Sequence, residues 1–207
     1  MRTLETEQDL KADAVALAAA HPEFAPLADL VAPLVLRRRA GGFAGIMHII
    51  LGQQVSTASA RAHWGRMCAA GLDRAEAVRA VADADLRACG LSRQKIAYAR
   101  HLAEAGFDFE VLDNLPDDAV IDQLMTLKGV GRWSAEIYAQ FSLGRADIFA
   151  AGDLALQEAA RVLRGLEVRP SEDRLREMAV AWSPNRTVAA IILWQYYAHL
   201  KSRDGVI

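Results

Sequence analysis

Apolar residues recur along this chain every three or four positions and seldom alternate with polar ones, a pattern that indicates amphipathic helices rather than strands. The segment 93–105 is the clearest case, because Ile96, Ala99 and Leu102 fall on one face of a helix. Ala and Leu are abundant and Pro is scarce, which favours helices over most of the length. The predicted fold class is therefore all-α.

Capping residues and helix breakers divide this pattern into twelve helices. Ser56, Ser92 and Ser171 stand where a helix N-cap is expected, and Gly71 and Gly90 stand where a helix should end. The expected helices span residues 6–20, 26–36, 43–51, 57–70, 73–81, 83–89, 93–105, 117–127, 132–141, 153–163, 171–181 and 184–201.

Length, cysteine content and charge narrow the class of protein. The 207 residues suffice for one domain or for two small, closely packed lobes. Two cysteines are too few for a disulfide framework or a four-thiolate iron–sulfur cluster. A net charge of −2 argues against a protein that coats nucleic acid, although a local basic patch can still bind DNA. With no signal-peptide pattern and no apolar run of membrane-spanning length, we expect a cytoplasmic location.

A short glycine-containing turn, Gly129-Val130-Gly131, joins the two expected helices at 117–127 and 132–141. A turn this short permits only a tight helix-to-helix corner, in which the glycines supply backbone angles that other residues resist. The second helix then begins with unpaired amides, which can bind a phosphate oxygen. An ordinary helix corner without a ligand is the alternative interpretation.

A single carboxylate, Asp153, follows this hairpin in apolar surroundings, with the segments 150–152 (Ala-Ala-Gly) and 154–156 (Leu-Ala-Leu) on either side. An isolated charge among apolar residues is costly, so such an acid is more often functional than one on the open surface. Asp153 also suits the N-cap of the helix that follows. The two roles are compatible.

Two pairs of side chains suggest contact with an unpaired base. Gln53 and Gln54 lie at a helix junction, where a flexible amide can fill a gap in a base stack, although a polar loop is the simpler interpretation. Trp133 and Trp194 lie on expected helices. Their flat faces suit a flipped base, above all one made cationic by alkylation, although aromatic residues on helices usually belong to the core.

Five motifs follow one another along the chain: Ile50–Ser56, Leu91–Lys95, Lys128–Ala135, Asp153, and Trp182–Arg186 leading to Trp194. Together they resemble the motifs of the helix-hairpin-helix (HhH-GPD) superfamily of base-excision DNA glycosylases, in particular the bacterial 3-methyladenine DNA glycosylase II (AlkA) group. The resemblance extends from about Phe43 to Leu200. Better-known relatives carry an extra N-terminal β-rich domain, which this chain is too short to include.

The resemblance implies a role for each motif. Asp153 is implied to be the catalytic acid, which stabilises an oxocarbenium-like sugar and orients or deprotonates a water. Gln53 and Gln54 match the residues at the wedge that enters the duplex. The base pocket is implied to contain Trp133, Trp194, Ile137 and Tyr138, and the phosphate-binding hairpin Gly129, Gly131, Arg132 and Ser134. The carbonyl groups of Leu127 and Gly129 are candidate ligands for Na⁺ or K⁺.

The implied reaction is hydrolysis of the N-glycosidic bond of alkylated purines, of the 3-methyladenine or 7-methylguanine type, after base flipping. Superfamily members that also cut the backbone hold a lysine where Trp133 stands, so we expect a monofunctional enzyme without lyase activity. One alternative is a glycosylase for deaminated or oxidised bases. Another is a non-catalytic helix-hairpin-helix DNA-binding module.

The family fold implies a single glycosylase unit over residues 1–207, built from two helical lobes with the active-site cleft between them. One lobe is expected to comprise about 1–40 and 145–207, and the other about 43–140, with the helix-hairpin-helix at about 117–141. The expected partner is double-stranded DNA with alkylated bases, bound by a monomer that has no membrane association. No organic cofactor or iron–sulfur cluster is implied, and the expected location is the bacterial cytoplasm, at the nucleoid.

Overall fold

The computed structural model describes residues 2–203. Within this range the protein is all-α, with an isolated β-bridge between Thr3 and Arg145 and no β-strand. The described α-helices are α1 (Glu7–Ala20), α2 (Ala25–Leu30), α3 (Gly42–Gly52), α4 (Thr57–Ala69), α5 (Ala75–Ala80), α6 (Asp83–Ala88), α7 (Arg93–Glu104), α8 (Asp117–Met125), α9 (Arg132–Phe141), α10 (Leu154–Leu163), α11 (Glu172–Val180) and α12 (Arg186–Arg203). Two 3₁₀-helices, η1 (Pro22–Phe24) and η2 (Glu110–Asn114), complete the set in these residues.

The three serine caps predicted from the sequence are confirmed. The hydroxyl of Ser56 accepts a hydrogen bond from the backbone N–H three residues ahead, and those of Ser92 and Ser171 do the same. Each bond satisfies one of the amides left without a partner in the first turn of a helix. The starts of α4, α7 and α11 were therefore readable from local chemistry.

The predicted helix at 26–36 is wrong in its second half, because α2 ends at Leu30. Pro33 has no N–H to donate to a preceding carbonyl, so the helix cannot continue through it. From Pro33 to Gly41 the chain is non-helical. The short 3₁₀-helix η2 lies in a stretch where the sequence pattern predicts no helix.

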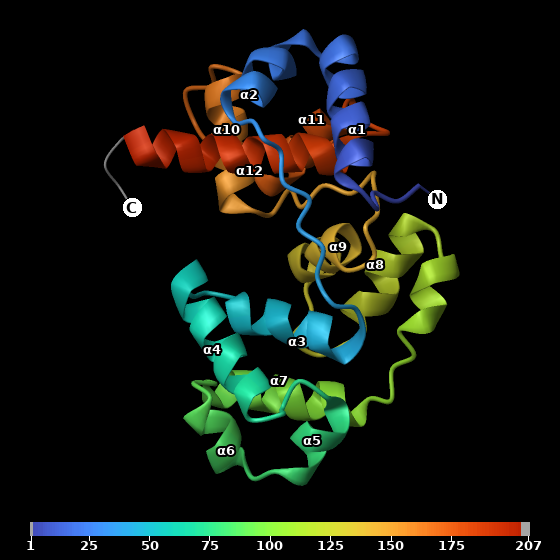
Figure 1. Ribbon diagram of the computed structural model, residues 1–207, viewed down its shortest axis with the longest axis vertical. Helices are drawn as coiled ribbons and strands as arrows, with labels where there is room; N and C mark the ends of the chain where they lie inside the picture. The colour runs from blue at the N-terminus through green and yellow to red at the C-terminus, as the bar shows by residue number, and fades with distance from the viewer. Residues whose placement is uncertain (1, 204–207) are drawn as a thin grey trace. The chain divides into compact units, whose positions relative to one another are not determined.

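The chain divides into two compact units. Unit 1 contains the chain up to Arg38 and from Ala139 onward. In this unit α12 packs against α10, α1 and α2 (Figure 1). Its core includes the fully buried Trp182, whose ring meets Phe24 edge to face with centroids 5.3 Å apart. Trp182 also packs against Phe149, in the segment that leads into α10, with ring centroids 5.2 Å apart.

Unit 2 contains Arg39–Tyr138. Helix α3 packs against α4 and α7, and α5 and α6 pack against α7 (Figure 1). The apolar side chains of α3, including Ile46 and Ile50, are fully buried, which stabilises the unit around this helix. The boundary between the units falls inside α9, so this one helix contributes residues to both.

In the described part of the chain, no helix combines the length and the apolar character that crossing a membrane requires.

Candidate functional site

The hairpin between α8 and α9 in unit 2 depends on Gly129. Its φ of +91° lies in the left-handed region, and a Cβ built on it would come within 2.5 Å of the Tyr98 ring. Gly131 differs, because its φ is not in the left-handed region and a Cβ there would meet nothing within 4 Å. The expectation that both glycines supply unusual backbone angles is therefore wrong for Gly131. What Gly131 provides is an exposed, open approach to the first turn of α9.

The two polar residues predicted at the hairpin, Arg132 and Ser134, differ in exposure and in their hydrogen-bond partners. Arg132 is exposed at the start of α9, and its Nε donates to Oε1 of the buried Glu136 over 3.1 Å. Ser134 is buried, and its Oγ accepts a hydrogen bond from Nε2 of Gln53. Arg132 is therefore exposed and can present positive charge at the surface, whereas the buried Ser134 hydroxyl is engaged with Gln53; phosphate binding by Ser134 stays a prediction.

The two glutamines that follow α3 are also used differently. The Nε2 of Gln53 donates to the Gly129 carbonyl and to the Ser134 hydroxyl, both over 2.9 Å, so this side chain is turned toward the hairpin. Gln54 is exposed and has a φ of +58°, which is uncommon for a non-glycine residue. Gln53 therefore links the loop to the hairpin, and Gln54 is the more exposed of the two; a wedge role for either glutamine stays a prediction.

Lys95, on α7, also contacts this loop, and in the sequence it is the last residue of the motif Leu91–Lys95. Its Nζ donates to the carbonyls of Leu51, over 2.7 Å, and Gln53, over 2.8 Å. Partial burial lowers the pKa of the Lys95 ammonium below its ordinary value. Lysine and glutamine are common surface residues, so the sequence carried no signal that these side chains bridge the two motifs.

The predicted pocket residues of α9 that belong to unit 2 differ in exposure. Trp133 is half-buried at the first turn of α9, while Ile137 is buried. Tyr138 is only 1% exposed, and its hydroxyl accepts a hydrogen bond from the Gly42 N–H over 2.7 Å. Burial raises the pKa of Tyr138 to about 12, so the phenol stays neutral. The Tyr138 hydroxyl oxygen is thus engaged within unit 2, and a role of Tyr138 in a base pocket stays a prediction.

In unit 1, Asp153 is the N-cap of α10. Its Oδ1 accepts hydrogen bonds from the backbone N–H of Ala155 (2.9 Å) and of Leu156 (3.2 Å). The same oxygen accepts a third bond, over 3.1 Å, from the indole Nε1 of Trp194 on α12. Three donors orient the carboxylate and compensate for its partial burial. The cap predicted from the sequence is confirmed, whereas nothing in the sequence pattern indicated the indole hydrogen bond.

Trp194 also has an aromatic neighbour. Its ring lies 5.5 Å from that of Phe141, the last residue of α9, with the planes inclined at 40°. The half-buried indole thus lies beside both a second aromatic ring and the Asp153 carboxylate. An arrangement of this kind offers π-faces together with a negative charge, which favours cationic aromatic ligands.

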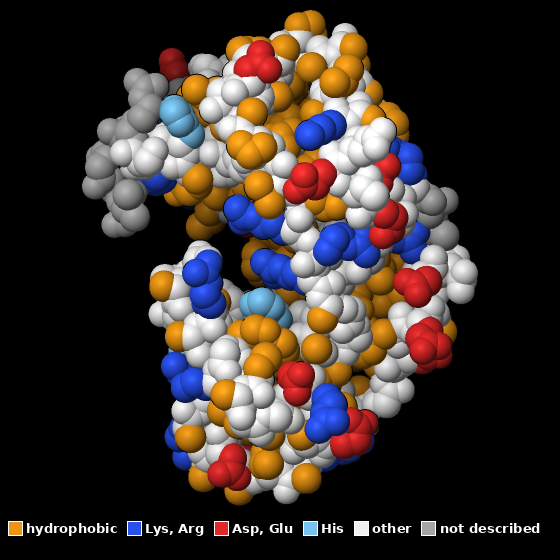
Figure 2. Space-filling view, in the orientation of Figure 1, with side chains coloured by type: hydrophobic (Ala, Val, Ile, Leu, Met, Phe, Trp, Pro, Cys, Tyr) orange, Lys and Arg blue, Asp and Glu red, His pale blue; other side chains and the backbone are white. Residues whose placement is uncertain are grey.

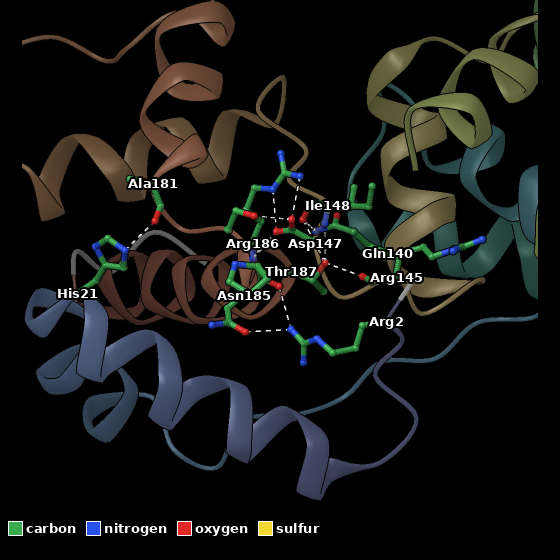
Figure 3. Close-up of polar contacts among 12 residues, drawn as sticks. Arg2, His21, Gln140, Arg145, Asp147, Ile148, Ala181, Asn185, Arg186 and Thr187 are labelled. Atoms are coloured by element: carbon green, nitrogen blue, oxygen red, sulfur yellow. Dashed lines mark hydrogen bonds and ion pairs between the residues drawn. The ribbon is translucent and has the colours of Figure 1, made fainter. Parts of the chain in front are cut away.

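The connector between α9 and α10, which leads to Asp153, is tied to the start of α12 (Figure 3). Asp147 accepts hydrogen bonds from Arg186 Nε over 2.8 Å and from Ser183 Oγ over 2.7 Å. The buried Thr187 hydroxyl donates to the Arg145 carbonyl over 2.7 Å. Gln140 of α9 donates to the Ile148 carbonyl over 2.9 Å. These bonds give an otherwise irregular segment a defined path, as the satisfaction of its buried polar groups requires.

Exposed basic side chains are present on the surface of the protein. Figure 2 shows Lys and Arg side chains on the viewed face interspersed with acidic and apolar ones, in keeping with the net charge of −2. In unit 2 the exposed Lys128 and Arg132 flank the hairpin turn. Any attraction for a polyanion must therefore be local, at features such as this turn.

The two carbonyls suggested for a monovalent cation already accept hydrogen bonds. The Leu127 carbonyl accepts from the Val130 N–H over 3.0 Å, and the Gly129 carbonyl accepts from Gln53. A carbonyl oxygen has two lone pairs, so one on each remains compatible with a cation. Cation binding at this turn stays a prediction.

Comparison with known proteins shows which family the chain matches. Residues 47–184 match the HhH-GPD superfamily base excision DNA repair protein family. The alkylbase DNA glycosidase-like protein mag2 of Schizosaccharomyces pombe is 28% identical over 185 residues, which cover 84% of this chain and 79% of that protein.

Two solved structures share the fold. The 3-methyladenine DNA glycosylase Mag1 of Schizosaccharomyces pombe, in complex with abasic DNA, matches with a TM-score of 0.80 and 26% identity, over 89% of this chain and 95% of that one. A DNA-3-methyladenine glycosidase from Bacillus halodurans matches with a TM-score of 0.76 and 30% identity, over 98% and 95% of the two chains. The family match covers more than half of the chain, and the similarities to the two solved structures cover 89% and 98% of it. The chain therefore belongs to the HhH-GPD superfamily of base excision DNA repair proteins, and within it is similar to the 3-methyladenine DNA glycosylases.

Proposed function

We propose that this protein is a DNA glycosylase that removes alkylated purines, of the 3-methyladenine or 7-methylguanine type, from double-stranded DNA. The observation that carries the proposal is the hydrogen bond between Trp194 and Asp153, which holds an indole beside an oriented carboxylate. An alkylated purine carries positive charge on its ring, so aromatic faces bind it by stacking and by cation–π attraction. The names of the similar proteins support the same substrate class.

Asp153 supplies the chemistry in this proposal. As the C–N bond to an alkylated base lengthens, the sugar gains oxocarbenium character, and the base departs with the bonding electrons. The Asp153 carboxylate stabilises the positive charge on the sugar and orients a water, or accepts its proton, as that water adds to the anomeric carbon. The three N–H groups on Oδ1 hold the carboxylate in place before the reaction begins, so it need not reorganise.

Trp133 determines the outcome for the DNA backbone. An amine at this place could attack the sugar and form a Schiff base, which leads to strand cleavage, but an indole has no such nucleophile. The amine of Lys95, on α7, does not take this role in the proposal, because its Nζ donates hydrogen bonds to two carbonyl groups of unit 2. We therefore propose a monofunctional enzyme that leaves an intact strand with an abasic site.

In this proposal, residues of unit 2 bind the DNA backbone and enter the duplex. The first-turn amides of α9, reached past Gly131, bind a phosphate oxygen, and Arg132 and Lys128 add local positive charge. Gln54, exposed in the loop after α3, enters the space left when a nucleotide is flipped out. All of these groups come from one chain, so a monomer suffices.

Base release from duplex DNA treated with a methylating agent tests the proposal. The freed bases are separated by chromatography, and the strands are analysed with and without alkali. We expect release of 3-methyladenine or 7-methylguanine and strand breaks only after alkali. Breaks without alkali would overturn the monofunctional assignment. Release only from DNA with deaminated or oxidised bases would change the substrate class, and binding without release from any of these substrates would indicate a non-catalytic DNA-binding module.

A further inference from the structure

The loop Gly52–Ser56 carries an exposed glutamine, Gln54, whose backbone conformation is uncommon for a residue other than glycine. Gln54 has a φ of +58°, in the left-handed region that side chains with a Cβ rarely occupy. A residue held in such a conformation requires support from its surroundings. The support comes from two neighbouring segments of unit 2.

The first support is Lys95. Helix α3 ends at Gly52, so the carbonyls at its end lack the N–H partners that a longer helix would supply. Lys95 Nζ donates to the Leu51 and Gln53 carbonyls, the residues on either side of Gly52. An ammonium group is also favoured electrostatically at the C-terminal end of a helix. Lys95 thereby holds the backbone immediately before Gln54.

The second support is the side chain of Gln53. Its Nε2 donates to the Gly129 carbonyl in the hairpin turn and to the Ser134 hydroxyl in the first turn of α9. Gln53 is therefore held at its backbone by Lys95 and holds the hairpin with its side chain. The result is a continuous set of hydrogen bonds from α7, through the loop, to the phosphate-binding turn.

We propose that Lys95 is a positioning residue for base flipping: through Gln53 it makes the Gln54 loop and the hairpin a single rigid body, so that Gln54 enters the duplex at a set distance from the phosphate that the hairpin binds. This inference rests on the proposed function. Lys95 acts on the step that separates a paired base from its partner and leaves the chemistry at Asp153 unaffected. Two short hydrogen bonds to carbonyl oxygens direct its ammonium group into the protein, which distinguishes it from a lysine that contacts phosphate.

The test compares two duplexes that carry the same alkylated purine, one opposite its normal partner base and one opposite an abasic analogue. In the second duplex no pair has to be opened, so the wedge matters little. We expect Lys95→Met to lower the single-turnover excision rate at least tenfold on the paired lesion and less than threefold on the unpaired one. Lys95→Arg, which keeps a cationic donor, should recover much of the loss.

A double-mutant cycle with Gln54→Ala connects Lys95 to the wedge. If Lys95 acts through Gln54, Lys95→Met should change the rate by less than about twofold once Gln54 is an alanine, because coupled residues are not additive. Gln53→Met, which leaves the backbone carbonyl for Lys95 but removes the bonds to the hairpin, should reproduce the selective loss on the paired lesion. If Lys95→Met fails to fold, the Gln53→Met variant tests the same hydrogen-bonded connection between the loop and the hairpin.

Lys128→Met serves as a matched control, since Lys128 is an exposed lysine of the hairpin turn. It should weaken DNA binding and its salt dependence while leaving the ratio of the two excision rates unchanged. Equal losses on both duplexes, additive effects with Gln54→Ala, or a Lys95→Met variant that behaves like Lys128→Met would each overturn the proposal.

Fluorescence of 2-aminopurine placed opposite the lesion provides a readout that does not depend on catalysis. In an Asp153→Asn background, binding should raise the fluorescence as the probe loses its partner, and Lys95→Met should reduce that rise at saturating protein. If the wild-type protein releases no alkylated base, the proposed function fails, yet this binding measurement still decides the role of Lys95. An undiminished rise with Lys95→Met would contradict that role.

Discussion

The two glycines of the hairpin turn look equivalent in the sequence but are not equivalent in the structure. Gly129 combines a left-handed φ with the Tyr98 ring where a Cβ would lie, whereas Gly131 has neither constraint. We expect Gly129→Ala to lower the free energy of unfolding by about 2–4 kcal/mol, from backbone strain and overpacking together.

Gly131→Ala should change the free energy of unfolding by less than about 1 kcal/mol, because a methyl group there has open space. It should nevertheless weaken DNA binding, since the methyl group obstructs the approach of a phosphate to the α9 amides. Urea denaturation and DNA titration of both variants check this pair. A Gly129→Ala variant as stable as wild type would show that the turn does not require glycine.

At the residue scale, the sequence indicated Asp153 as a candidate acid but did not indicate the partners of its carboxylate. The apolar neighbours of Asp153 and its place before a helix were enough to predict a cap and a candidate catalytic group. The indole of Trp194 that donates to it comes from 41 residues later, on another helix. Contacts of this range depend on how helices pack, so no local pattern records them. The same holds for Gln53, whose partners lie 76 and 81 residues away.

At the scale of the elements, the ion pair between Asp147 and Arg186 is one of the interactions that hold the connector before α10. Burial raises the pKa of Asp147, but hydrogen bonds from Arg186 and Ser183 and the charge of Arg186 outweigh it and hold the pKa below its ordinary value of 3.8. A lowered native pKa means that the carboxylate stabilises the fold above the unfolded-state pKa and loses this effect as the pH falls through the native pKa. Asp147→Asn should therefore cost about 1–3 kcal/mol of stability at pH 7.

The difference in unfolding free energy between wild type and Asp147→Asn should shrink once the pH falls below about 4, where the wild-type carboxyl begins to bind a proton on unfolding. Urea denaturation at pH 7, 5, 4 and 3 measures it. Asp122→Asn, which changes an exposed acid on α8, is the control and should have little effect at pH 7. A difference that stays constant to pH 3 would mean that Asp147 does not act as a charged partner of Arg186.

Helices were the most predictable elements, because their period, their caps and their breakers are local. Ser56, Ser92 and Ser171 marked three starts correctly. The overextended helix at 26–36 failed at Pro33, where the periodic apolar pattern continued but the backbone could not donate a hydrogen bond. The apolar pattern alone predicts a longer helix, but the missing N–H of Pro33 ends α2 before this residue.

For the whole molecule, the small net charge means that DNA must be bound by a few groups. Each phosphate that a cation neutralises contributes a slope of about −0.9 to the dependence of log K on log salt. We expect Arg132→Gln to reduce the magnitude of this slope by about one. Arg174→Gln, which removes the same charge from α11, should leave it unchanged. DNA titrations over a series of salt concentrations check this, and equal slopes for wild type and Arg132→Gln would remove Arg132 from the phosphate grip.

The assignment as a whole depends on Asp153, and single-turnover excision by Asp153→Asn tests it most directly. Asparagine keeps a side-chain oxygen that can cap α10 and accept from Trp194, so the fold and the affinity for DNA should be preserved. Loss of the negative charge should lower the rate of base release by a factor on the order of 10²–10³. If Asp153→Asn bound DNA like the wild type and released alkylated bases at the same rate, the assignment of Asp153 as the catalytic acid would be wrong.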